Sequence, residues 1–210
     1  MTDFNAMNQA LVSCDTAELT RLVNDAVAAD VPAADILNQG LIAGMDIVGE
    51  KMESGDMFIP EVLMAAQAMA YCLETIKPLL GEGEGGDETC VIIGTVKGDL
   101  HDIGKNLVSM MLESAGMTVY DLGVDIPPED FVAQVKEKNA RLVCLSALLT
   151  TTMPMMKQTV DAIVEAGIRD QVKILVGGAP VTQAFADEIG ADGFAADAGS
   201  ASKLAKALAA

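Results

Sequence analysis

Residues 89–108 read TCVIIGTVKGDLHDIGKNLV and contain the clearest indication of the fold. An apolar run rich in β-branched residues (89–96) ends at a turn that contains Gly98, and apolar residues return at helical spacing from Ile103. The pattern predicts a buried strand, a turn and a helix, the repeating unit of a parallel α/β sheet. His101, the only histidine in the chain, lies in this turn between Asp99 and Asp102.

The same alternation continues to the end of the chain. Further strands are predicted at 118–123, 141–148, 173–178 and 191–196, and helices at 103–114, 128–138, 153–165, 182–189 and 200–209. Five strands with intervening helices predict an α/β domain with a flavodoxin-like (Rossmann-like) five-stranded parallel sheet in the order 2-1-3-4-5. Such sheets bind ligands beyond the carboxyl ends of the strands, where the strand order reverses, and the His101 turn lies there.

The first part of the chain predicts helices instead. Asp15 with Glu18 three residues later is a capping-box pattern, and Pro32 and Pro60 suit the starts of two later helices. With a short helix before Asp15, we expect an N-terminal four-helix bundle. The glycine-rich, charged stretch GEGEGGD (81–87) is typical of a flexible linker, so the predicted domains are 1–86 and 87–210.

Composition narrows the possible functions. The net charge of -18, from 13 basic and 31 acidic residues, disfavours binding to nucleic acid or to an anionic membrane. There is no apolar run of the ~20 residues that span a bilayer and no basic N-terminal signal region, so we expect a cytoplasmic protein. The four cysteines have no zinc-site spacing; we interpret Cys90 and Cys144, which lie in apolar runs, as core residues and assign no functional role to any of the four.

His101 has two interpretations at this stage. It is either a structural histidine in a loop or a metal ligand whose second ring nitrogen donates to Asp99. One histidine cannot form a protein metal site, because structural zinc needs about four ligands. A metal bound by His101 would therefore arrive with its other ligands, as in a macrocyclic cofactor, and haem and corrin both fit.

Glycines and hydroxyls follow the predicted strands at the same edge. Gly98, Gly104 and the Gly177–Gly178 pair either clear space for a bulky ligand or form ordinary turns. Ser146, Thr150, Thr151 and Thr152 either bind a cofactor tail or cap the helix near Met153. Neither the P-loop motif nor the dinucleotide motif G-x-G-x-x-G is present, and no G-x-S-x-G elbow surrounds Ser146.

Taken together, these residues resemble a known family. Asp99-x-His101-x-x-Gly104, Ser146-x-Leu148 and Gly177-Gly178 resemble the D-x-H-x-x-G…S-x-L…G-G signature of cobalamin-binding domains. The stretch GEKMESGDMFIPEVLMAAQAM (49–69) resembles the helical cap that precedes that domain in methionine synthase and in corrinoid proteins of methanogens and acetogens. Over nearly its whole length the chain is similar to stand-alone corrinoid proteins of methylamine, betaine and methanol methyltransferase systems.

The resemblance implies roles for individual residues. His101 would be the lower axial ligand of cobalt in place of the cofactor's dimethylbenzimidazole base, with Asp99 hydrogen-bonded to it. The third position of this relay, a serine in methionine synthase, falls on Thr152, which keeps a hydroxyl; the three residues would act in methyl transfer. Around the loop the implied cofactor contacts also include Gly98, Leu100, Asp102, Ile103 and Gly104. Contacts with the cofactor's tail would be Ser146, Leu148, Thr150, Gly177, Gly178 and Ala198.

The cap contacts implied by the resemblance are Met52, Ile59, Val62 and Met64. Met52 departs from methionine synthase, which has an aromatic residue there, so the details of capping differ.

The implied function is that of a methyl carrier rather than of an enzyme on its own. Cobalamin, alternating between methylcobalamin and cob(I)alamin, would take a methyl group from a donor-specific methyltransferase. A second methyltransferase would pass the group to a thiol or tetrahydrofolate, and a reductive activation protein would restore the cobalt. The donor stays open among methanol, methylamines, glycine betaine and aryl methyl ethers, with methylamine or betaine favoured. The alternatives are a corrinoid-sensing regulator, a mutase-associated cobalamin module and a flavodoxin-like carrier of FMN.

Overall fold

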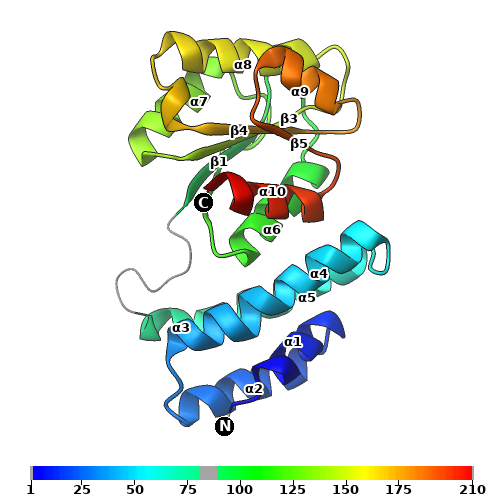
Figure 1. Ribbon diagram of the computed structural model, residues 1–210, viewed down its shortest axis with the longest axis vertical. Coiled ribbons are helices and arrows are strands. Elements are labelled where there is room, and N and C mark those ends of the chain that lie inside the picture. The colour runs from blue at the N-terminus through cyan, green and yellow to red at the C-terminus, as the bar shows by residue number, and fades with distance from the viewer. Residues whose placement is uncertain (1, 81–88, 210) are drawn as a thin grey trace. The chain divides into compact units, whose positions relative to one another are not determined.

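The computed structural model describes residues 2–80 and 89–209. The chain divides into two compact units, one mainly from residues before 89 and one mainly from residue 89 onward (Figure 1). The predicted linker at 81–87 and the predicted domain boundary between residues 86 and 87 lie outside the described residues. The exact boundary therefore stays a prediction.

The first unit is helical, as expected. Its elements are α1 (Phe4–Val12), α2 (Thr16–Ala28), α3 (Ala33–Asp35), a π-helical segment (Ile36–Ile42), α4 (Ala43–Ser54), α5 (Ile59–Ile76) and a 3₁₀ turn (Lys77–Leu79). Because α3, the π segment and α4 are continuous, they form one long helix. Residues 2–80 therefore form four helices, which confirms the predicted helical cap.

The helix starts follow the predicted signals with one exception. The Asp15 carboxylate accepts from the amide of Glu18 at 3.0 Å, and α3 begins directly after Pro32. Glu18 does not complete a capping box in the way the sequence predicts, because its carboxylate pairs with Arg21 at 2.6 Å. At the start of α5, Glu61 instead reaches back and accepts from the amide of Phe58 at 2.9 Å.

The sequence does not predict the π-helical segment. Its wider turn is seen where the amide of Ala43 donates to the carbonyl of Asn38, five residues earlier. Two glycines in and after this segment lie directly against α1. A Cβ at Gly40 would come within 2.6 Å of Met7 Sδ, and one at Gly44 within 2.6 Å of Leu11 Cδ1 and 3.2 Å of Asn8 Cα. The two glycines therefore allow a close approach of two helices.

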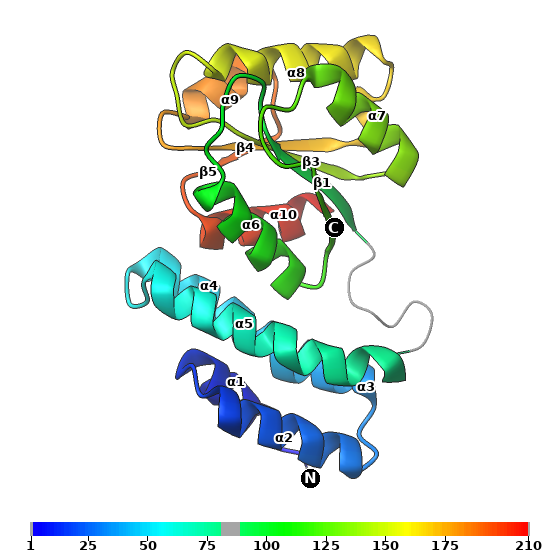
Figure 2. The same cartoon turned by 180° about the vertical axis from the view of Figure 1, so that it is seen from behind.

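The second unit alternates strands and helices. Its elements are β1 (Cys90–Thr95), α6 (Ile103–Ser114), β2 (Thr118–Asp121), α7 (Pro128–Lys138), β3 (Leu142–Ser146), α8 (Met153–Glu165), a 3₁₀ turn (Arg169–Gln171), β4 (Lys173–Gly177), α9 (Gln183–Ile189), β5 (Gly193–Ala195) and α10 (Ala198–Ala209). The five strands are parallel and lie in the order β2-β1-β3-β4-β5, which confirms the flavodoxin-like prediction. Helices α7, α8 and α9 cover one face of the sheet, and α6 and α10 cover the other (Figures 1 and 2).

The core of this unit explains why its central strands β1, β3 and β4 are largely apolar, whereas the edge strand β2 is mostly exposed. Strands covered on both faces have no solvent side, and residues 142–145 of β3 are all buried. Gly94 in β1 makes room for a neighbour, because a Cβ there would come within 2.8 Å of the buried Phe131 ring. Among the described residues, no helix combines the length and apolar character needed to cross a bilayer.

Several element ends differ from the predicted ranges by one or two residues, and two of these differences have a local reason. β2 stops at Asp121 rather than at residue 123, because the Asp121 carboxylate accepts from the amide of Gly123 at 2.8 Å and turns the chain. α10 starts at Ala198 rather than at Ser200, because Asp197 caps it by accepting from the amide of Ser200 at 2.8 Å.

We predict that Gly44→Ala loosens the helical unit. The added methyl group would meet Leu11 and the backbone of Asn8, and such overpacking costs about 1–3 kcal/mol. Hydrogen exchange of the α1 and α4 amides measures the effect and should become faster. The matched control is Gly104→Ala in α6, where an added Cβ meets nothing within 4 Å. Equal exchange in both variants would contradict the close helix contact.

Candidate functional site

The turn after β1 carries the site. The amide of Asp99 donates to the carbonyl of Val96 at 3.1 Å, which closes a tight turn. Gly98 has φ +83°, the left-handed conformation that such a turn requires and that glycine adopts without a Cβ penalty. Beyond the turn, the Thr95 hydroxyl donates to the carbonyl of His101 at 2.8 Å and ties the histidine's main chain to the end of β1. The sequence did not single out Thr95.

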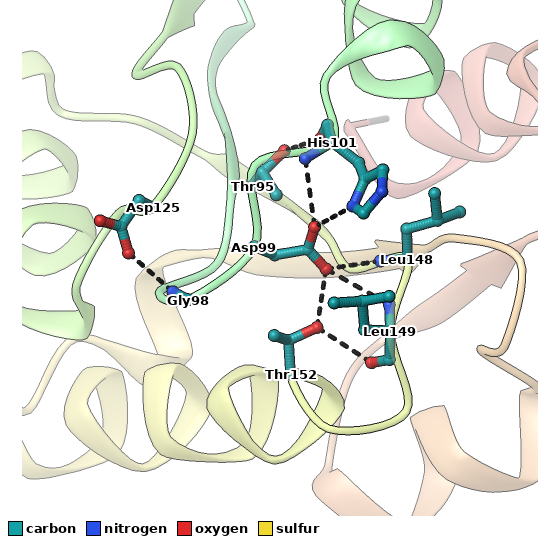
Figure 3. Close-up of polar contacts among 8 residues, drawn as sticks. All are labelled: Thr95, Gly98, Asp99, His101, Asp125, Leu148, Leu149 and Thr152. Atoms are coloured by element: carbon teal, nitrogen blue, oxygen red, sulfur yellow. Dashed lines mark hydrogen bonds and ion pairs between the residues drawn. The ribbon is translucent and has the colours of Figure 1, made fainter.

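The centre of the site is the carboxylate of Asp99, which is completely buried. Oδ1 accepts from the amide of His101 at 3.1 Å and lies 2.6 Å from the Nδ1 atom of its ring. Oδ2 accepts from the hydroxyl of Thr152 at 2.7 Å and from the amides of Leu148 and Leu149 at 2.8 and 3.3 Å (Figure 3). The predicted relay of Asp99, His101 and Thr152 is therefore assembled by direct hydrogen bonds.

These donors keep Asp99 ionised. Burial by itself would raise the pKa of a carboxyl group, because it removes the charged form from water. Hydrogen bonds from Thr152, from the His101 ring and from the amides of Leu148 and His101 outweigh that effect and hold the pKa of Asp99 well below its usual range. Asp99 is thus an anion at neutral pH and can only accept hydrogen bonds.

An anionic Asp99 decides which nitrogen of His101 is free. Because the carboxylate accepts, Nδ1 of a neutral imidazole carries the proton, and Nε2 keeps its lone pair. The side chain of His101 is 49 % exposed, so the ring is held on one side and accessible on the other. This is the arrangement in which a histidine binds a metal through Nε2 with a carboxylate behind it.

Thr152 serves the carboxylate rather than the helix. It occupies the N-cap position of α8, yet its side chain makes no capping bond there. The buried hydroxyl lies 2.7 Å from Asp99 Oδ2 and 2.9 Å from the carbonyl of Leu149, and its single proton serves one of them at a time. For Thr152, helix capping is therefore the wrong interpretation; its hydroxyl binds Asp99, and a role in methyl transfer stays a prediction.

Other predicted residues gather along the carboxyl ends of the strands. Ser146 of β3 is paired laterally with Thr95 of β1 and with Gly177 of β4. Thr150 is exposed in the following loop, and Ala198 is buried at the start of α10. This edge of the sheet thus brings the predicted tail contacts together, whereas a role for each of them in binding stays a prediction.

The Gly177–Gly178 pair has an explanation within the fold. A Cβ at Gly178 would lie 1.9 Å from the carbonyl oxygen of Ala147, and one at Gly177 would lie 3.2 Å from that of Ala195. Gly178 also has φ +131°. Close approach of neighbouring backbones therefore requires these glycines, whether or not a ligand lies beside them.

Gly104 is different. It stands in the first turn of α6, has no left-handed φ, and an added Cβ would meet nothing within 4 Å. Glycine weakens a helix, so a glycine without a steric role is unfavourable for the fold. Apolar side chains on either side of His101 point into solvent, with Leu100 72 % and Ile103 83 % exposed. An open backbone beside exposed apolar groups is typical of a site that receives a bulky apolar ligand.

The predicted cap residues lie in the helical unit and differ in their solvent exposure. Ile59 and Met64 are exposed, and Met52 is partly buried. Val62 has no exposed area, because it belongs to the buried stripe of α5 that continues through Ala65 and Met69. The structure therefore does not present Val62 as a surface contact, in contrast to the prediction.

The other side chains with reactive groups to consider are the four cysteines. Burial raises the pKa of the Cys144 thiol to about 12, and it also raises the pKa values of Cys14, Cys72 and Cys90. These thiols stay protonated and weakly nucleophilic at neutral pH. Within 2–80 and 89–209, no group of three or more His, Cys, Asp or Glu residues is arranged to hold a metal ion.

Family models match both units of the chain. A model described as a B12 binding domain matches residues 89–205, and a second model with the same description matches residues 4–77.

Individual proteins are similar over almost the whole chain. A dimethylamine corrinoid protein of Methanosarcina barkeri is 45 % identical over 200 residues, covering 95 % of this chain and 93 % of that protein. The crystal structure of a cobalamin-binding protein from Desulfitobacterium hafniense DCB-2 superposes with a TM-score of 0.85 at 34 % identity, covering 99 % of both chains. The methanol:cobalamin methyltransferase complex MtaBC from Methanosarcina barkeri contains a chain with a TM-score of 0.82 at 30 % identity, covering 98 % of this chain and 79 % of that one.

We predict that Asp99→Asn destabilises the protein in a pH-dependent manner. At about pH 7 the loss should be roughly 2–4 kcal/mol, because hydrogen bonds to a buried anion are each worth ~1.5–3 kcal/mol. The folded pKa lies below the ordinary 3.8, so the stabilisation is complete above that pH and is lost as the pH falls toward the folded value. Urea unfolding of the apoprotein at about pH 7 and about pH 3 measures the difference from wild type, which should shrink at the lower pH.

Asp102→Asn is the matched control for this experiment. Asp102 is an exposed carboxylate whose side chain accepts from Asn106 at 3.3 Å, so its replacement should change stability by less than about 0.5 kcal/mol. A loss for Asp99→Asn that is the same at both pH values would contradict a stabilising anion.

Proposed function

The chain belongs to the family of B12-binding corrinoid proteins, and from this premise we propose that it carries a methyl group on a bound corrinoid between two methyltransferases. In this role the protein is the corrinoid subunit of a multi-component methyltransferase system and not an enzyme by itself. The observation that carries the proposal is the single histidine held by a buried, ionised Asp99 with Nε2 accessible.

The residues present fit a corrinoid. A corrin brings four equatorial nitrogens to its cobalt, so one imidazole suffices as the axial ligand from the chain. The apolar side chains of Leu100 and Ile103 and the open backbone at Gly104 suit the broad, largely apolar face of such a macrocycle. When bound, the corrinoid supplies a cobalt that can accept and release a methyl group.

The chain's own residues have distinct tasks in this proposal. His101 offers Nε2 to the cobalt, and the Asp99 carboxylate holds Nδ1–H and fixes the plane of the ring. Thr152, with the amides of Leu148 and Leu149, keeps Asp99 in place by binding its other oxygen.

Further cofactor contacts are proposed for the strand edge and, separately, for the helical unit. Ser146, Leu148, Thr150, Gly177, Gly178 and Ala198 lie at the carboxyl edge of the sheet, where we place the cofactor's nucleotide tail. The exposed Ile59 and Met64, with the partly buried Met52, are the proposed contacts of the helical cap.

The proposed partners are a methylamine-type methyltransferase as donor, an acceptor methyltransferase that methylates a thiol or tetrahydrofolate, and a reductive activation protein. The 45 % identity to a dimethylamine corrinoid protein supports a methylamine donor over methanol, whose complex contains a chain only 30 % identical. Glycine betaine as donor and residence in the cytoplasm stay predictions from the sequence.

We predict that His101→Ala still folds but binds hydroxocobalamin without a protein ligand on the cobalt. The absorption spectrum of the reconstituted variant should differ from that of wild type, and added imidazole should restore the wild-type spectrum because the ring position is accessible. Identical spectra before imidazole is added would remove His101 as the ligand. Retention of flavin instead of corrin by wild type would overturn the proposed function.

We predict that Gly104→Ala separates stability from binding. Removing a glycine from a helix should stabilise the apoprotein by about 0.5–1 kcal/mol, since the new methyl group meets no neighbour. The same methyl group would stand where the corrin approaches and should weaken hydroxocobalamin binding by roughly tenfold or more. Spectroscopic titration and thermal unfolding give the two numbers. Unchanged affinity would show that the macrocycle does not approach Gly104.

A further inference from the structure

Asp125, in the loop after β2, has an unfavourable backbone conformation. Its φ is +58°, the left-handed region that non-glycine residues rarely adopt. Such residues persist where surrounding structure enforces them, and they concentrate at functional sites. The side chain is exposed, so burial of apolar surface does not account for the residue.

Asp125 makes hydrogen bonds to the main chain of two residues of the site, Gly98 and Asp99. Its carboxylate Oδ1 accepts from the amide of Gly98 at 2.7 Å (Figure 3). Its own amide donates to the carbonyl of Asp99 at 3.0 Å. One residue therefore holds both ends of the Gly98–Asp99 segment, which is the segment that places the buried carboxylate under His101.

The loop that carries Asp125 is itself anchored on β1. The amide of Ile126 donates to the carbonyl of Thr95 at 3.0 Å, and the amide of Thr95 donates to the carbonyl of Gly123 at 2.9 Å. Thr95 also binds the carbonyl of His101 through its hydroxyl. The loop that binds Gly98 and Asp99 through Asp125 is thus itself bound to the end of β1, the strand that precedes the site.

Asp99 is consequently held from two sides. The loop after β3 binds its carboxylate through Leu148 and Thr152, and the loop after β2 binds its main chain through Asp125. Each loop restrains a different part of the same residue. If the main chain were released, the carboxylate could stay with β3 while its distance to the ring of His101 changed.

We infer that Asp125 is a positioning residue for His101. It holds the Gly98–Asp99 turn in the one geometry in which Asp99 meets both the imidazole and the β3 loop. The effect of Asp125 on the Gly98–Asp99 turn applies to the protein without cofactor. Its effect on the binding of His101 to cobalt rests on the proposed function.

Two substitutions separate the hydrogen bond from the backbone conformation. Asp125→Gly accepts a positive φ more readily than aspartate but removes the acceptor for Gly98. Asp125→Asn also tolerates a positive φ and keeps an oxygen acceptor. If Asp125 had no effect on the site, Asp125→Gly would be as stable as wild type or more stable, because glycine relieves the strained φ, and the site would be unchanged. A positioning residue predicts unchanged or higher stability with an altered site.

The first readout uses the apoprotein labelled with ¹⁵N. In Asp125→Gly, hydrogen exchange of the Gly98 amide should become roughly tenfold faster, and the ¹⁵N shift of the His101 Nδ1 atom should change. In Asp125→Asn both should stay near wild type. The control is Asp30→Gly, the same substitution at another aspartate with a left-handed φ of +54°, at the end of α2, and it should change neither quantity.

The second readout is titration with hydroxocobalamin. Asp125→Gly should bind roughly five- to tenfold more weakly than wild type with a smaller share of His101-ligated cobalt, and Asp125→Asn should recover binding to within about twofold. Wild-type exchange at Gly98 and an unchanged His101 ring in apo Asp125→Gly would overturn the inference. If wild type binds no corrin, the proposed function fails, while the apoprotein exchange still decides whether Asp125 holds the turn.

Discussion

The site depends on the cost of burying one carboxylate. Removing an anion from water costs several kcal/mol unless hydrogen bonds replace its hydration, and Asp99 is completely buried. The replacement comes from His101 on one oxygen and from Leu148, Leu149 and Thr152 on the other. Because the donors come from two separate loops, the charge is satisfied only when both loops are in their observed places. The orientation of the imidazole follows from satisfying this charge.

The topology of the sheet brings these donors together. In the order β2-β1-β3 the loops after β2 and β3 flank the loop after β1, although they are far from it in sequence. Parallel strands place all three loops at the same edge, where the helices begin. A histidine in the loop after β1 can therefore be supported from both sides by residues such as Thr152 and Asp125, and its outer face stays open.

Much of this arrangement could be predicted from the sequence. Apolar strands and a 3.6-residue period indicate the doubly wound sheet, and a lone histidine close to Asp99 leaves a supported metal ligand as one of two interpretations. Thr152 was found through its position in a family pattern, because a threonine before a helix by itself suggests a cap. The sequence could not show why residue 178 is a glycine, because only the folded backbone brings the carbonyl of Ala147 close to its Cα.

Other features depend on contacts that no local pattern reports. Asp125 acts through the backbone of a neighbouring loop, and its left-handed φ leaves no mark in composition or spacing. The close approach at Gly44 depends on how α1 packs against α4, and no local pattern predicts the π-helical segment. Val62 shows the limit of transferring a role by position, since its side chain is buried in the core stripe of α5.

The structure and the family together lead to the proposal that Nε2 of His101 is the axial ligand of the cobalt. Its most direct test is electron paramagnetic resonance of the protein loaded with unlabelled cob(II)alamin, with the protein either unlabelled or uniformly labelled with ¹⁵N. His101 is the only histidine in the chain, so a protein imidazole on the cobalt can come from no other residue. If Nε2 of His101 binds the cobalt, the axial nitrogen splitting changes from a triplet to a doublet when the protein is labelled. A triplet that persists would show that the cofactor's own base is the ligand and would contradict the account.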